Sequence, residues 1–183
     1  MGNFMKIMNE GEIERILRSL CQRILRKKEN LDNLVIVGIQ RRGAILARRI
    51  SGLIEDLKGQ KIPVGSLDIN LYRDDLSRIS YQPVIRDTDI PFPVDDKYIL
   101  LVDDVLYTGR TVRAALDALL DLGRPRKIEL LVLVDRNCRE LPIQADYVGK
   151  KIVVSPEKLV EVRLRELDKK EEVVIFQREK DEI

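Results

Sequence analysis

The chain has 183 residues, of which 44% are hydrophobic and 35% are charged, and its formal net charge is +2. This length and composition favour one domain with its own core, and no apolar run approaches the roughly 20 residues of a membrane-spanning helix, so we expect no membrane partner. The absence of histidine excludes His-based triads, His general bases and His metal sites, which leaves carboxylates, arginines, lysines, hydroxyls and backbone amides to carry any chemistry.

The first part of the chain predicts a helix followed by a βα unit. Apolar residues at helical spacing predict a helix over residues 10–28, with Asn9 as its N-cap. The apolar run Leu34–Ile39 predicts a buried strand, and Gly43–Lys58 predicts the next helix. A looser alternation over Ile62–Tyr72 predicts a strand nearer the edge of the sheet.

The rest of the chain predicts a long loop, a second βαβ unit and a β-rich flap. Arg73–Lys97 is polar and rich in proline, which is typical of a lid or an extended hairpin. The unbroken apolar run Tyr98–Val102 predicts a strand buried on both faces, Thr111–Leu122 predicts a helix, and Ile128–Val134 predicts a third strand. Short strand-like pieces then follow at Ile152–Val154, Leu159–Leu164 and Glu172–Gln177.

This order of elements predicts an α/β domain with a parallel sheet flanked by helices. The predicted strands end at Gly38, Asp103 and Asp135, which we therefore expect at one edge of the sheet. Ligands of open α/β sheets bind at this edge, so the chemistry should lie there.

Two acidic residues and a short loop follow the strand Tyr98–Val102 directly. Asp103 and Asp104 can accept hydrogen bonds from sugar hydroxyls and help to place Mg²⁺, and residues 108–111 can hold a phosphate at a helix N-terminus. These residues suit a phosphorylated sugar. Taken alone, two adjacent acids also fit an acidic strand end, a turn and a capped helix.

The stretch Tyr98–Thr111 resembles the 5-phosphoribosyl-1-pyrophosphate (PRPP) signature of type I phosphoribosyltransferases. That signature is a hydrophobic strand, two acidic residues, a loop with Thr-Gly-x-Thr, and a helix. The resemblance implies the type I phosphoribosyltransferase fold, a parallel α/β sheet flanked by helices with a small β-rich hood. It implies PRPP contacts from Asp103, Asp104, Val105, Leu106, Tyr107, Thr108, Gly109, Arg110 and Thr111.

The segment Gly38–Gly43 joins the first predicted strand to the helix that follows it. In the resembled family the equivalent loop holds pyrophosphate, which implies that role for Gln40, Arg41, Arg42 and Gly43. Arg41 or Arg42 could neutralise this leaving group by bidentate contacts, so both are candidate catalytic residues together with Asp103 and Asp104. Taken alone, the segment also fits an ordinary βα turn with solvated arginines.

Three further segments are similar to the PyrR family of pyrimidine-operon regulators with uracil phosphoribosyltransferase activity. They are Leu71–Ser77, Asp135–Ile143 and Ala145–Lys150. The resemblance covers essentially the whole chain and implies a single domain over 1–183, a flexible loop over 72–97 and a hood with the terminal strands from 136–183. It implies flexible-loop roles for Tyr72, Arg73, Asp74 and Asp75, and base-binding roles for Arg86, Arg136 and Val160.

Two adjacent residues depart from that family. Asn137 and Cys138 stand where the family pattern has Gly-His, and a cysteine cannot supply a cationic imidazole. A small surface thiol is the plainest interpretation of Cys138. Because Cys21 and Cys138 lie far apart without metal-ligand spacing, we expect a reducing, cytoplasmic setting.

The resemblance implies two activities. One transfers the phosphoribosyl group of PRPP to uracil with Mg²⁺ as cofactor, giving UMP and pyrophosphate. The other is attenuation of transcription by UMP- or UTP-dependent binding to the mRNA leader of pyrimidine genes, with RNA contacts from Arg139 and Lys150. Arg18, on a basic stripe of the first predicted helix, is a further candidate RNA contact. The family also implies a homodimer or a higher homo-oligomer. Because purine enzymes share the PRPP signature, hypoxanthine or guanine transfer without an RNA-binding role is the alternative.

Overall fold

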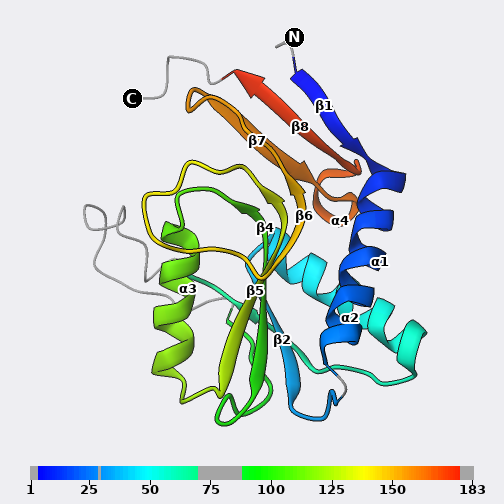
Figure 1. The fold of residues 1–183 in the computed structure, drawn as a ribbon, viewed down its shortest axis with the longest axis vertical. Coiled ribbons are helices and arrows are strands. Elements are labelled where there is room, and N and C mark those ends of the chain that lie inside the picture. The colour runs from blue at the N-terminus through cyan, green and yellow to red at the C-terminus, as the bar shows by residue number, and fades with distance from the viewer. Residues whose placement is uncertain (1–3, 29, 70–87, 178–183) are drawn as a thin grey trace.

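A computed structural model describes residues 4–28, 30–69 and 88–177. Its centre is a five-stranded parallel sheet in the order β3-β2-β4-β5-β6. A three-stranded antiparallel sheet in the order β1-β8-β7, here called the hood sheet, lies beyond one end of the central sheet (Figure 1). The central strands are β2 (Leu34–Ile39), β3 (Val64–Leu67), β4 (Tyr98–Leu106), β5 (Lys127–Asp135) and β6 (Tyr147–Lys151).

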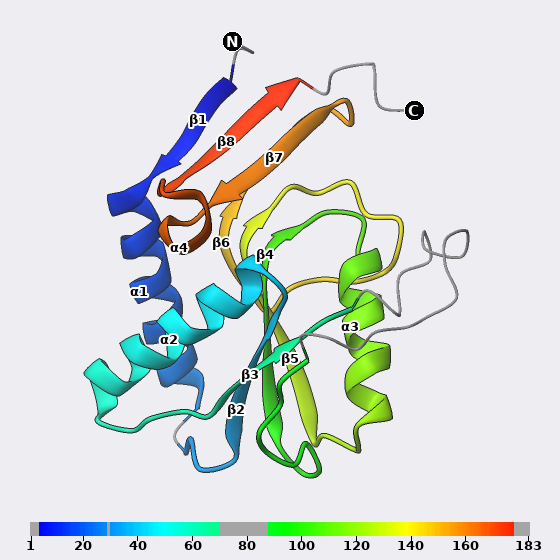
Figure 2. The same cartoon turned by 180° about the vertical axis from the view of Figure 1, so that it is seen from behind.

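Helices cover both faces of the central sheet. Helices α1 (Glu10–Lys27) and α2 (Arg42–Lys58) lie on one face, and α3 (Arg110–Asp121) lies on the other (Figure 2). The short helix α4 (Arg165–Asp168) joins two strands of the hood sheet. None of the helices within the described residues is long and apolar enough to cross a membrane.

The core has one layer on each face of the central sheet. The layer under α1 and α2 continues into the hood sheet through Val162 and Val173, while the other layer lies beneath α3. Strand β4 contributes Leu100 to the first layer and Leu101 to the second, which matches a strand buried on both faces. The hood sheet consists of β1 (Phe4–Asn9), β7 (Lys158–Arg163) and β8 (Glu172–Gln177).

The predicted parallel sheet and its flanking helices are confirmed, and Asn9 caps α1 by accepting a hydrogen bond from the Glu12 amide at 3.0 Å. Two strand predictions are wrong. Strand β4 continues to Leu106, so both aspartates lie inside the strand rather than after it. Residues 152–154 are not a strand, and the edge strand of the central sheet lies just before them, at Tyr147–Lys151.

The sequence reasoning also missed β1, which pairs with the last strand of the chain, β8. Its residues are mostly exposed, so their pattern carries no core signal, and its partner lies more than 160 residues away. The edge strand β3 is shorter than the predicted Ile62–Tyr72, whose last residues lie outside the described part of the chain.

Candidate functional site

Asp103 and Asp104 form an acidic pair within β4, at the edge of the sheet where α2 and α3 begin. The Asp103 residue is only 6% exposed, and its carboxylate accepts a hydrogen bond from the Asp104 amide at 2.9 Å. The Asp104 carboxylate accepts one from the Val105 amide at 3.0 Å. Backbone amides therefore hold both carboxylates in place.

Burial of this pair changes its ionisation. Burial raises the pKa of Asp103 well above its usual value, and the neighbouring charge of Asp104 raises it further. Burial also raises the pKa of Asp104, while the positive charge of Arg42 acts in the opposite direction. No salt bridge joins either carboxylate to a cation of the described residues. The pair is therefore suited to hydroxyl donors or a cation that a ligand brings.

The start of α2 lies directly against the acidic pair because of Gly43. A β-carbon at this position would lie 2.4 Å from the carbonyl oxygen of Val102 and 3.2 Å from the Cα of Asp103. Only glycine permits this approach of helix to strand. The local sequence therefore brings the predicted pyrophosphate loop and the predicted ribose carboxylates together.

The two arginines of the predicted pyrophosphate loop lie in different surroundings. Arg41 is exposed, and the peptide bond that precedes it is cis. Arg42 is the first residue of α2, and its Nη2 donates to Asp168 Oδ1 at 2.9 Å and lies 3.7 Å from Glu161 Oε1. The side chain of Gln40 donates to Ser66 Oγ at 3.1 Å, which ties the loop to the edge strand β3. The structure thus separates an arginine that faces solvent from one paired with acidic side chains.

The loop that precedes α3 places backbone amides next to the end of β4. Gly109 is the N-cap residue of α3 and has a φ of 94°, a left-handed conformation that favours glycine. The carbonyl oxygen of Thr108 accepts hydrogen bonds from the amides of Glu140 at 2.9 Å and Leu141 at 3.1 Å. The Arg110 amide donates to Thr108 Oγ1 at 3.3 Å. Together these contacts fix the helix start that the sequence predicts as a phosphate site.

Arg136 connects this loop to the hood sheet. The residue is 3% exposed, and its guanidinium carbon lies 3.8 Å from the centre of the Tyr107 ring. Its Nη1 donates to the carbonyl oxygen of Lys158 at 3.0 Å and its Nη2 to that of Ser155 at 3.4 Å. Val160, two residues further along β7, is half-buried. The two predicted base-binding residues therefore lie on the same side of the site.

The three predicted RNA-contact residues do not share one environment. Arg18 is exposed on α1. Arg139 donates to the carbonyl oxygens of Tyr107 and Ile143, each at 2.9 Å, and pairs with Asp135 at 2.7 Å. The ammonium group of Lys150 donates to the carbonyl oxygen of Ile7 at 2.7 Å. Arg139 thus supports the loop that follows β4.

Some predicted residues lie outside the described part of the chain. They are Tyr72, Arg73, Asp74, Asp75 and Arg86. Conversely, sequence reasoning missed Glu161 and Asp168 as partners of Arg42. Both come from residues 155–177, here called the hood region, which contain β7, α4 and β8. No local pattern links them to a loop more than 100 residues earlier. Within the described residues there is no group of three or more His, Cys, Asp or Glu side chains that could hold a metal ion.

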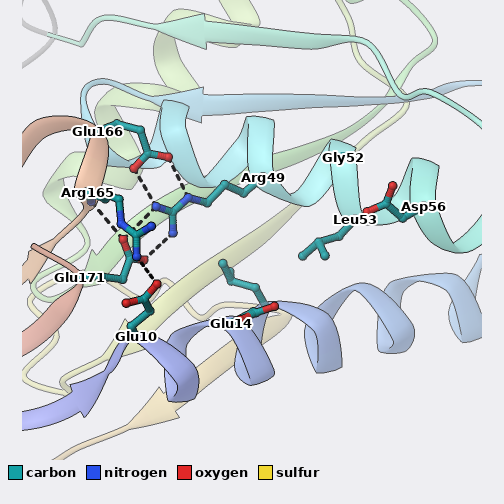
Figure 3. Close-up of a pocket in the computed structure, with 10 residues that line it drawn as sticks. Glu10, Glu14, Arg49, Gly52, Leu53, Asp56, Arg165, Glu166 and Glu171 are labelled. Carbon is teal, nitrogen blue, oxygen red and sulfur yellow. Dashed lines mark hydrogen bonds and ion pairs between the residues drawn. The ribbon is translucent and has the colours of Figure 1, made fainter. Parts of the chain in front are cut away.

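One cavity lies away from the predicted site, between α1, α2 and α4 (Figure 3). It measures about 570 Å³ and carries Glu10, Glu14 and Asp56 on its walls. Arg49 crosses one end and binds Glu166. A second cavity of about 360 Å³ lies beside Asn137 and Arg139, next to the edge strand β6. Neither cavity contains the acidic pair.

Comparison with known proteins points to one family. The profile of the phosphoribosyl transferase domain matches residues 6–167. The chain is 54% identical over 172 residues to the bifunctional protein PyrR of Pelotomaculum thermopropionicum, across 94% of this chain and 95% of the relative. It is 51% identical over 174 residues to the bifunctional protein PyrR of Thermus thermophilus, across 95% and 96% of the two chains.

The fold is similar to that of solved phosphoribosyltransferases. A hypoxanthine phosphoribosyltransferase from Staphylococcus aureus aligns with a TM-score of 0.70 at 23% identity, covering 97% of this chain and 93% of the other. A mutant hypoxanthine phosphoribosyltransferase from Trypanosoma cruzi aligns with a TM-score of 0.74 at 18% identity, covering 96% of each chain. At these identities the likeness shows the fold alone, so it does not favour a purine base.

Proposed function

The chain belongs to the phosphoribosyl transferase family and, within it, to the PyrR proteins, and we propose that it combines uracil phosphoribosyl transfer with nucleotide-controlled RNA binding. One observation carries the enzymatic part. The acidic pair Asp103–Asp104 lies against the start of α2 through Gly43, and the loop before α3 follows on the same strand. A ribose, its 5′-phosphate and its diphosphate need these three parts side by side.

The reaction transfers the phosphoribosyl group, through its carbon C1, from pyrophosphate to uracil. It needs no protein nucleophile that bonds covalently to the ribose. As the bond from C1 to the diphosphate oxygen lengthens, positive charge develops on the ribose. Asp103 and Asp104 accept hydrogen bonds from the ribose hydroxyls, and their negative charge stabilises the developing cation. Amides of residues 108–111 hold the 5′-phosphate, while the exposed Arg41 neutralises the departing pyrophosphate.

The donor set suits Mg²⁺ that arrives with its substrate. Asp103 and Asp104 offer two carboxylates, and Mg²⁺ in phosphate-binding sites commonly takes one or two carboxylates, with phosphates and waters completing its shell. When bound, Mg²⁺ supplies positive charge to the diphosphate leaving group. Raised pKa values of the two buried carboxyl groups in the free protein fit a site that is completed by an incoming cation.

The base-binding part of the proposal involves Arg136 and Val160. The guanidinium group of Arg136 is committed to the carbonyl oxygens of Ser155 and Lys158. Its contribution is therefore to hold the backbone of the hood region beside Tyr107. Backbone groups near Val160 can form hydrogen bonds with a uracil ring there. Arg86 is retained as a candidate ligand contact outside the described residues.

A panel of bases tests the enzymatic part. The purified protein is incubated with PRPP, Mg²⁺ and one of uracil, orotate, hypoxanthine or guanine, and nucleotide formation is followed by chromatography. We expect UMP from uracil and no nucleotide from the other bases. Turnover of hypoxanthine or guanine without turnover of uracil would instead establish the purine alternative.

The second part of the proposal is binding to the mRNA leader of pyrimidine genes, controlled by UMP or UTP. Arg18, Arg139 and Lys150 supply positive charge for RNA phosphates, and a nucleotide in the uracil site couples to RNA if both prefer one arrangement of the hood region. RNA affinity is measured with and without UMP at several salt concentrations. We expect UMP to tighten binding and salt to weaken it, and an affinity indifferent to both would refute the regulator.

The remaining parts of the proposal concern assembly and location. We propose a homodimer or a higher homo-oligomer in the cytoplasm, in line with membership of the PyrR proteins. Exposed Phe4 and Met5 on the edge strand β1 offer apolar surface for such an assembly. Sedimentation equilibrium measures the mass directly, and a monomer at micromolar concentration would contradict the oligomer.

A further inference from the structure

Arg42, at the start of α2, is held by two carboxylates from the hood region. Its Nη2 donates to Asp168 Oδ1 at 2.9 Å, and Glu161 Oε1 lies 3.7 Å from the same nitrogen. Asp168 ends the short helix α4, and Glu161 lies on β7. The side chain of Arg42 is 29% exposed, so solvent only partly screens this contact.

Asp168 contacts only one of the two nitrogens, Nε and Nη2, that form one edge of the Arg42 guanidinium group. Nε of Arg42 is buried and has no hydrogen-bond partner among the described residues. Asp168 does not supply one, and its second oxygen, Oδ2, instead accepts the amide of Leu164 at 2.8 Å. An Arg side chain binds planar or tetrahedral oxyanions best through two parallel hydrogen bonds. A buried donor left without an acceptor is costly, so the present arrangement is incomplete.

A phosphoryl group would supply the acceptor that Nε of Arg42 lacks. It carries free oxygens on one face, and two of them can accept from Nε and Nη2 of Arg42 together. Arg42 belongs to the loop proposed for the diphosphate and begins a helix with no acidic residue in its first turn. Carboxylate and phosphoryl oxygens therefore compete for the same nitrogen, Nη2.

We propose that Asp168, assisted by Glu161, is a carboxylate placeholder that occupies Arg42 until the diphosphate of the substrate displaces it. This inference rests on the proposed function, because it requires a diphosphate at the loop before α2. The placeholder sets the affinity for diphosphate. It keeps the arginine folded onto the hood region in the free protein, and part of the binding free energy is used to break the Arg42–Asp168 pair.

The exchange leaves α4 attached to α2. Arg49, seven residues after Arg42 on the same side of α2, binds Glu166 through Nε at 2.9 Å and Nη2 at 2.7 Å (Figure 3). Arg49 also pairs with Glu171. The second arginine keeps the short helix in place when the first is released, and Glu166 provides a matched control on the same short helix.

The test is a calorimetric titration of the full-length protein with magnesium pyrophosphate. Asp168→Asn retains an oxygen that can accept from the Leu164 amide, and it replaces the other oxygen with an NH₂ group that cannot accept from Arg42. We expect Asp168→Asn to lower the Kd for pyrophosphate roughly tenfold, the size of one charge-assisted hydrogen bond. Glu161→Gln should lower it less, and Glu166→Gln should leave it unchanged.

The outcomes separate the placeholder from a merely structural contact. If Asp168→Asn and Glu166→Gln both weaken pyrophosphate binding and lower Tm, the pair only supports the hood region and the placeholder is refuted. An unchanged Kd in Asp168→Asn refutes it as well, while leaving the proposed function intact. Wild-type protein that is folded yet binds no pyrophosphate would refute the proposed function itself. Finally, the effect of Asp168→Asn should vanish in an Arg42→Gln background, and its persistence there would assign it to another contact.

Discussion

Asp103 and Asp104 place two carboxyl groups inside a strand that is otherwise apolar. Burial raises the pKa of both, so ionising them costs the folded state free energy that the unfolded chain does not lose. Such a cost agrees with the proposed role of the pair in binding a ligand. A PRPP molecule with its Mg²⁺ would relieve it.

We therefore predict that Asp103→Asn stabilises the free protein. The unfolded carboxyl ionises near pH 4, so the cost in the wild type appears as pH rises through that value. The unfolding free energy of Asp103→Asn at pH 7 should exceed that of the wild type by about 1 kcal/mol. Urea unfolding at pH 7 and pH 3 measures the difference. A gain equally large at pH 3, where the carboxyl is protonated in both states, would contradict the account.

A second prediction at this scale concerns Gly43. Gly43→Ala would push a methyl group to 2.4 Å from the carbonyl oxygen of Val102, so the start of α2 must move away from the acidic pair. We expect a loss of about 2 kcal/mol of unfolding free energy, and a weaker binding of pyrophosphate. Denaturant unfolding and calorimetry measure the two effects.

Gly52 supplies the control for this prediction, because it lies in the same helix and a β-carbon there meets nothing within 4 Å. Gly52→Ala should stabilise the protein by up to about 1 kcal/mol through helix propensity. If both glycine variants behaved alike, the close approach at Gly43 would not be the cause.

At the scale of elements, one buried charge joins α1 to β5. Burial alone would raise the pKa of Glu129, but hydrogen bonds from Lys27, Lys28 and Lys127 outweigh it and lower the pKa to about 2. Lys27 and Lys28 each lie 2.8 Å from the Glu129 carboxylate. The lysines at the end of α1 thereby fix this helix to the central sheet.

This pairing predicts a defined acid sensitivity. Because the folded pKa is lowered, the stabilisation is fully present above the unfolded value of about 4.5 and is lost as pH falls toward 2. Glu129→Gln should cost about 2 kcal/mol at pH 7, and the difference from the wild type should shrink between pH 4.5 and pH 2. Thermal unfolding across this range checks it. A difference that stays constant down to pH 2 would assign the loss to packing.

Elements with a strong apolar pattern were predictable from the sequence, and those set by distant partners were not. The runs Leu34–Ile39 and Tyr98–Val102 are apolar enough to be buried wherever they pair, so their positions as central strands were predictable. Strand β1 is exposed and exists through its pairing with β8. The end of β4 was misjudged because two acids inside a strand contradict the usual propensity, which the pairing of β4 with β5 overrides here.

The same distinction holds for the site. The acidic pair, the loop before α3 and the loop before α2 are each local in sequence, and their neighbouring positions follow from parallel strands that end at one edge. The contacts of Arg42 with Asp168 and of Arg136 with the Ser155 and Lys158 carbonyls bridge the central sheet to the hood region. No periodicity encodes such contacts, because they depend on how the two sheets are placed.

For the whole molecule, the proposed RNA contacts should be separable from catalysis. Arg18 is exposed on α1, so Arg18→Ala should weaken RNA binding. The slope of the logarithm of the binding constant against the logarithm of the salt concentration should become shallower by about one. Arg139 instead holds the carbonyl oxygen of Tyr107, so Arg139→Ala should impair both RNA binding and uracil transfer. Filter binding and a turnover assay measure the two properties. Equal loss of turnover in both variants would contradict this separation.

The central claim is that Asp103 and Asp104 carry phosphoribosyl transfer to uracil. The most direct measurement is the rate of UMP formation from uracil, PRPP and Mg²⁺, compared between the wild type and an Asp103→Asn/Asp104→Asn double variant whose fold is verified by circular dichroism. We predict turnover by the wild type and a rate lower by roughly a thousandfold in the double variant. Equal rates in the two proteins, or no UMP from the folded wild type, would contradict the account.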